Sequence, residues 1–158
     1  MSKIRLEFKW AIRFLLAVLA WMILEKYVGL HDVHIAKHAI YTNLFALVAI
    51  TIYVLALLDK RNNDYEGKMS WKQGFTAGVT MTIIIALFSP LTQYISSTVI
   101  SPDYFNNIIE YSVETKKMNR EIAEGYFSLG SYMLQAFFGA LTMGVVTSAI
   151  VAYFVKKQ

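Results

Sequence analysis

The stretch from Met69 to Ile100 constrains the fold more than any other part of the chain. After Lys72 the chain runs for thirty residues, as far as Pro102, without a charged side chain. An apolar run of this length is typical of a helix that spans a membrane. Ser70 lies three residues before Gln73, and this spacing predicts a capping box at the helix start. Pro90 predicts a kink, because proline lacks the amide donor of a regular helix.

Small residues recur along this stretch at spacings of three and four, beginning with Gly74 and Gly78. Such spacing places them on one face of a helix, and small faces allow membrane helices to approach closely. A second small face follows near the C-terminus. We therefore predict helix packing at these positions: Gly74, Gly78, Pro90, Ala140, Gly144 and Ser148. The pattern leaves open whether the contacts form within one chain or between two copies.

Composition extends this conclusion to the whole chain. Hydrophobic residues make up 56% of the sequence and charged residues 16%, and the mean hydropathy is +0.45. These values favour a membrane protein over a soluble helical bundle. We predict an all-α fold in one membrane domain, residues 1–158: an integral membrane four-helix bundle with spans at about 10–30, 37–58, 71–98 and 131–154. The first apolar block continues past Ala20, which favours an uncleaved span over a signal peptide.

Between the third and fourth spans the chain becomes amphipathic. Ser101, Pro102 and Asp103 have the residue types of a helix start: a cap, a first-turn proline and a first-turn acid. Apolar residues then keep helical spacing on one face, from Tyr104 to Ile122. We predict an amphipathic helix at about 102–124 that lies outside the hydrocarbon.

The distribution of Lys and Arg predicts the orientation of the chain. Ten of the fifteen lie at the start, in the loop before the third span, or at the end. Since positively charged loops favour the cytoplasmic side, both termini are predicted to be cytoplasmic. The same distribution explains the net charge of +4 without a nucleic-acid partner.

The order of these features resembles a known family. Ser70-Trp71-Lys72-Gln73-Gly74-Phe75-Thr76-Ala77-Gly78 opens the third span, Ser101-Pro102-Asp103-Tyr104-Phe105 opens the amphipathic segment, and a small-residue span ends at Lys156-Lys157. Together they resemble the bacterial membrane proteins grouped as domain of unknown function 4199, best represented in Bacteroidota. The resemblance implies a four-span protein of the bacterial inner membrane. It implies no reaction, ligand or catalytic residue.

Three histidines form the strongest candidate site. His31, His34 and His38 are spaced i, i+3 and i+7, so on a helix they share a face. Imidazole nitrogens bind zinc and other transition metals, and Glu25 or Asp32 could add a carboxylate. The same cluster is a candidate pH sensor. The favoured interpretation, however, is that these are polar residues at the membrane interface, so no cofactor is expected and zinc is the alternative.

The sequence contains no pattern typical of an enzyme. It has no cysteine, which excludes thiolate chemistry, and it has no HExxH, GxSxG or phosphate-loop motif. The favoured function is therefore a non-enzymatic scaffold or accessory subunit in the lipid bilayer, which contacts a second copy or another membrane protein. The alternatives are an oligomeric permeation protein for ions or small solutes, and a metal or pH sensor.

Overall fold

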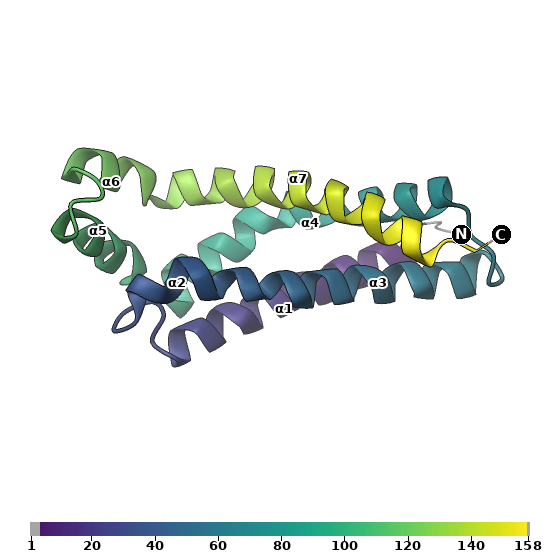
Figure 1. The fold of residues 1–158 in the computed structure, drawn as a ribbon, viewed down its shortest axis with the longest axis horizontal. Coiled ribbons are helices and arrows are strands. Elements are labelled where there is room, and N and C mark those ends of the chain that lie inside the picture. The colour runs from purple at the N-terminus through teal and green to yellow at the C-terminus, as the bar shows by residue number, and fades with distance from the viewer. Residues whose placement is uncertain (1–3, 158) are drawn as a thin grey trace.

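The computed structural model describes residues 4–157, and within that range the chain is helical, without strands. Its elements are α1 (Arg5–Tyr27), α2 (Ile35–Tyr41), η1 (Thr42–Leu44), α3 (Phe45–Asp64), α4 (Trp71–Ile95), η2 (Ser96–Ile100), α5 (Tyr104–Glu114), α6 (Arg120–Tyr126) and α7 (Leu129–Val155). The long helices lie side by side along one axis, and the short helices α5 and α6 cover one end (Figure 1). The predicted all-α class is confirmed.

Contacts between sequence-distant residues define the other end of the bundle. Lys9 of α1 pairs with Asp59 of α3 at 2.6 Å. Arg61 Nη1 donates to the Val155 carbonyl at the end of α7, at 2.9 Å. The segment before α4 is hydrogen-bonded to the segment after α7: Met69 N donates to Lys157 O at 2.8 Å. The start of α1 and the end of α7 therefore lie at the same end of the molecule (Figure 1).

Within residues 4–157, three helical segments are long and apolar enough to cross a membrane: Ile35–Asp64, Trp71–Ile100 and Leu129–Val155. At 1.5 Å per residue, even the shortest is about 40 Å long, which exceeds a hydrocarbon core of about 30 Å. The chain is accordingly a membrane protein. In α1 the apolar run is interrupted by Arg13, Glu25 and Lys26, and its crossing of the membrane stays a prediction.

The α4 helix begins at the predicted capping box. The Ser70 side chain accepts from Gln73 N, and the Gln73 side chain accepts from Ser70 N. This exchange satisfies two amide donors at the start of the helix. The helix continues past half-buried Pro90 to Ile95, and a π-helical turn, η2, extends it to Ile100.

The two small-residue faces pack against each other, and α4 and α7 are the most extensively packed pair of helices. A Cβ added at Gly74 would lie 3.2 Å from the Ala152 Cβ, and one added at Gly78 would lie 2.6 Å from the Ser148 Oγ. At Gly144 an added Cβ would lie 2.4 Å from Thr82 Cγ2. These glycines are therefore required for the close approach of α4 and α7. Ala140 lies partly buried against the same core.

A buried polar contact links this pair of helices to α3. The Tyr53 hydroxyl lies 2.7 Å from Thr82 Oγ1, and Thr82 Oγ1 donates to the Gly78 carbonyl at 2.9 Å. Since the threonine hydrogen is already used, Tyr53 is the donor to Thr82. Tyr53 and Thr82 are 3% and 0% exposed, so the contact is part of the core.

The segment predicted as one amphipathic helix at 102–124 is two helices. α5 ends at Glu114, and Lys116 has a φ of +54°, a left-handed conformation that a helix interior does not adopt. Asn119 then caps α6, because its side chain accepts from Ile122 N at 2.9 Å. Arg120 returns to Glu110 of α5 at 2.9 Å. The apolar spacing crosses this break, which is why the sequence pattern did not predict it.

Candidate metal centre

A tight turn after α1 brings distant side chains together. Gly29 has a φ of +79°, and a Cβ there would lie 2.6 Å from Val33 Cγ2. Leu30 N donates to the Glu25 carbonyl at 2.9 Å, and His34 N donates to the Gly29 carbonyl at 2.7 Å. This turn reverses the chain, so that His31 returns to the last turn of α1, where Glu25 lies.

Glu25, His31 and His38 form the centre of the site. The His31 Nε2 atom lies 3.3 Å from Glu25 Oε2, and the His38 Nε2 atom lies 3.6 Å from the same oxygen. One ligand atom from each residue falls within 4.8 Å of the other two. Zinc binds nitrogen and oxygen at about 2.0–2.1 Å in a tetrahedral arrangement, which separates neighbouring ligand atoms by about 3.3 Å. The two distances from Glu25 to the histidines match this separation, so the three side chains form a candidate site for a metal ion with three protein ligands.

Each of these side chains is held by a further partner. Trp21 Nε1 donates to Glu25 Oε1 at 2.8 Å, which leaves Oε2 to face the histidines. The second nitrogen of His31, Nδ1, lies 2.6 Å from the Ser101 hydroxyl. Partners of this kind orient the ligands of metal sites and raise the affinity for the metal. The candidate site therefore combines three candidate ligands with residues that hold two of them in place.

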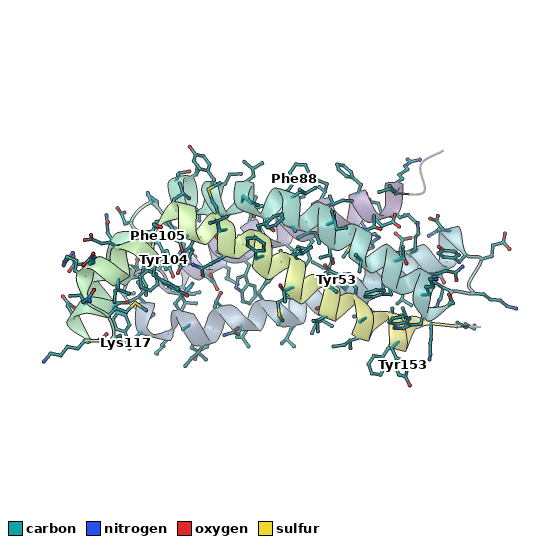
Figure 2. The ribbon with its side chains drawn as sticks, turned by 90° about the horizontal axis from the view of Figure 1, so that it is seen from above. Tyr53, Phe88, Tyr104, Phe105, Lys117 and Tyr153 are labelled. Atoms are coloured by element: carbon teal, nitrogen blue, oxygen red, sulfur yellow. The ribbon has the colours of Figure 1, made fainter. Side chains whose placement is uncertain are left out.

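Tyr104 of α5 holds the second histidine. Its hydroxyl lies 3.4 Å from His38 Nδ1 and 3.4 Å from the hydroxyl of Tyr132, and its ring packs against His31 and His38. Burial, followed by the nearby Tyr132 and Glu25, raises the pKa of the Tyr104 phenol, so this phenol stays protonated. Figure 2 shows Tyr104 and Phe105 at the end of the bundle opposite Tyr153. The site lies where α5 covers the bundle.

The predicted histidine cluster is only partly assembled. His31 is buried, but His34 is exposed and directly precedes α2. The three histidines do not share a helical face, because residues 28–34 form the turn and only His38 lies on a helix. Of the two acids considered, Glu25 joins the site, whereas Asp32 is exposed and accepts from Val33 N.

Sequence reasoning missed the residues that position the ligands. Trp21 lies four residues before Glu25, and this spacing alone places the two side chains on one helix face. The sequence does not indicate that Ser101 and Tyr104 contact the histidines. Its pattern places both residues at the start of the amphipathic helix, and their approach to His31 and His38 depends on how α5 folds over the bundle.

A cavity of about 160 Å³ borders both histidines. Its other walls carry hydrogen-bonding groups, among them Gln93, Ser96, Ser97, Tyr104 and Tyr132. The π-helical turn contributes Ser96 and Ser97. A ligand in this cavity would therefore meet polar groups and the edge of the candidate metal site together.

A family model described as "Protein of unknown function (DUF4199)" matches residues 9–157 of the chain. No curated protein matches the chain, and no solved structure matches it. The family description states no activity, so a function has to be argued from the geometry of the site.

Proposed function

The chain belongs to the DUF4199 family of proteins of unknown function, and we propose that it is a membrane protein that binds a divalent transition metal, with zinc the best match, through Glu25, His31 and His38. A single observation carries the proposal: two imidazole nitrogens lie 3.3 and 3.6 Å from one carboxylate oxygen, and one ligand atom from each of the three residues lies within 4.8 Å of the others. Two nitrogens and one oxygen suit zinc and its neighbours better than magnesium or calcium, which prefer oxygen ligands alone.

The position of the site favours a sensing role. The site joins the α1–α2 turn and α2 to the start of α5. His31 contacts Ser101, which precedes α5, and His38 contacts Tyr104, the first residue of α5. A metal held there would stabilise the contact between the turn and the helices that cover this end of the bundle. By the distribution of positive charge, this end faces away from the cytoplasm across a bacterial inner membrane, so the metal sensed is outside the cytoplasm.

The other functions considered from the sequence have less support. The scaffold hypothesis rests in part on two small-residue faces, but Gly78 and Gly144 on those faces pack α4 against α7 within the chain. A permeation path would have to pass Tyr53, Met81 and Ile85, each of which is at most 3% exposed in the middle of the bundle. Neither function is favoured by a specific contact.

Titration of the purified chain with Zn²⁺ or Co²⁺ tests the proposal. Binding to the folded state alone raises the melting temperature, and bound Co²⁺ develops the visible absorption of a four-coordinate site. Trp21 contacts Glu25, so Co²⁺ should also quench tryptophan fluorescence. No change in melting temperature, absorption or fluorescence would contradict the proposal.

The chain provides a matched pair of variants. His38→Ala removes a ligand and is expected to lower the Co²⁺ affinity by more than about 100-fold. His34→Ala removes an exposed histidine four residues away and is expected to leave the affinity unchanged. Equal loss in the two variants would indicate non-specific binding to surface histidines.

A further inference from the structure

A second hollow opens on the side of the bundle, between α3 and α7. These helices lie close together near the chain ends and diverge toward the site, in both views (Figures 1 and 2). The groove has a volume of about 300 Å³. Its exposed lining is mostly apolar, with Phe14, Val18, Phe45, Ala49, Ala136 and Ala140, although Ser89, Thr92 and Thr147 also border it. Met143, 64% exposed, also lines it. Most of the groove lies on α3, α4 and α7, whose segments are long and apolar enough to cross a membrane, so the surrounding medium is lipid.

The groove adjoins the cavity beside the metal site. Met22 and Gln93 line both hollows, so one side of each residue faces the apolar groove and the other faces the polar cavity. The lining changes along this path from Phe14 and Phe45 to Ser96, Ser97 and Tyr132. A molecule that occupied both hollows would need an apolar chain and a polar head.

Charge restricts the head group. A divalent metal with one ionised carboxylate and two neutral imidazoles carries a net charge of +1, and among the described residues no Lys or Arg lines the cavity. One monoanionic head neutralises this charge, whereas a dianionic phosphate would leave an uncompensated negative charge in a buried site, which is costly. The hydroxyl groups of Ser96 and Ser97 line the cavity and can donate to the oxygen atoms of such a head.

We propose that the ligand of this site is a long-chain carboxylate, a fatty acid. This inference rests on the proposed metal binding. Its acyl chain enters from the membrane through the α3–α7 groove, and its carboxylate reaches the metal in the cavity beside His31 and His38. The protein then senses a fatty acid with the metal as the anchor for the head group.

The test uses the Co²⁺-loaded full chain in phosphatidylcholine nanodiscs, with the visible absorption of Co²⁺ as the measurement. Hexadecanoate is expected to shift this absorption, because it changes the fourth ligand. Ala136→Phe fills the groove with a ring and is expected to raise the bilayer fraction of hexadecanoate required by roughly tenfold. Val146→Phe adds similar bulk at an exposed site on the same helix and is expected to leave the response unchanged. Acetate has no acyl chain, so its effect on the Co²⁺ absorption should be the same in the unmodified chain, Ala136→Phe and Val146→Phe.

The outcomes are distinct for the two proposals. No four-coordinate Co²⁺ absorption overturns both metal binding and the fatty-acid ligand. Normal Co²⁺ absorption that hexadecanoate does not shift overturns only the ligand, as does an equal response in Ala136→Phe and Val146→Phe. The assignment of a carboxylate head is overturned if hexadecyl phosphate shifts the Co²⁺ absorption at a lower bilayer fraction than hexadecanoate does. It is also overturned if hexadecanol shifts the absorption. A Glu25→Ala protein lacks one of the proposed ligands and is expected to show no change in Co²⁺ absorption with hexadecanoate. Any change that it does show measures Co²⁺ bound by the fatty acid itself and is subtracted.

Discussion

At the scale of single residues, Glu25 has the most demanding environment. Its side chain is buried, 1% exposed, and an ionised carboxylate in such a place requires donors or a cation. Trp21 donates to one oxygen, and His31 and His38 lie beside the other. An ionised carboxylate can only accept, so a neutral His31 would donate from Nε2 to Glu25 and accept at Nδ1 from Ser101. If Nε2 held a metal, the ring proton would lie on Nδ1 and Ser101 would accept it.

Protons are expected to compete with the metal at this site. A protonated imidazole cannot bind a metal, so affinity is highest where both histidines are neutral and falls as the pH decreases. Because protons and the metal compete for the same nitrogens, lowering the pH from 7.5 to 5.5 should lower the Co²⁺ affinity by more than about tenfold. Co²⁺ titrations at several pH values measure this change. A constant affinity over the range would exclude the histidines as ligands.

Trp21 is expected to affect metal binding without contacting the metal. Trp21→Phe keeps the ring in α1 but removes the donor to Glu25 Oε1, and the loss of such a partner lowers metal affinity by about 10–100-fold. Isothermal titration with Zn²⁺ measures the loss. Trp10→Phe, at the other end of α1, is the control. A wild-type affinity in Trp21→Phe would mean that Glu25 is positioned by its packing alone.

At the scale of helices, the packing of α4 against α7 allows a test with two glycines on one helix. In Gly144→Ala the new Cβ would lie 2.4 Å from Thr82 Cγ2 and 2.7 Å from the Tyr53 hydroxyl, and overpacking of this kind typically costs about 1–3 kcal/mol. In Gly139→Ala the new Cβ meets nothing within 4 Å, so stability should be unchanged or slightly higher. Thermal unfolding in detergent measures both. Equal melting temperatures would show that α4 and α7 can move apart at no cost.

Hydropathy and residue spacing predicted the helices well and their contacts less well. The capping box at Ser70 and the apolar run after Lys72 set the start and length of α4, because both are local properties of the sequence. The close contact of Gly78 with Ser148 was left open, since a small-residue face does not identify its partner. The site depends on non-local geometry: Gly29 turns the chain by adopting a positive φ, and only then do Glu25 and His31 meet.

At the scale of the whole molecule, the arrangement of helix ends predicts the topology. The start of α1, the α3–α4 loop and the end of α7 lie at one end, and α5 and α6 lie at the other. The chain has no cysteine, so single cysteines report position without background. Lys68→Cys should react with a membrane-impermeant maleimide only from the cytoplasmic side, and Glu121→Cys only from the opposite side. Labelling of both from the same side would contradict four crossings.

The pairing of α4 with α7 also has a consequence for biosynthesis. The two helices are neighbours in space, but α5 and α6 separate them in the chain. During translation α4 enters the bilayer first, and its glycine face, with the hydroxyls of Thr82 and Ser89, then faces lipid until the last helix emerges from the ribosome. A chain that stops before Leu129 would keep this face exposed to lipid. Such a product should be a substrate for membrane quality-control proteases, and pulse-chase labelling would show it disappearing faster than the full chain.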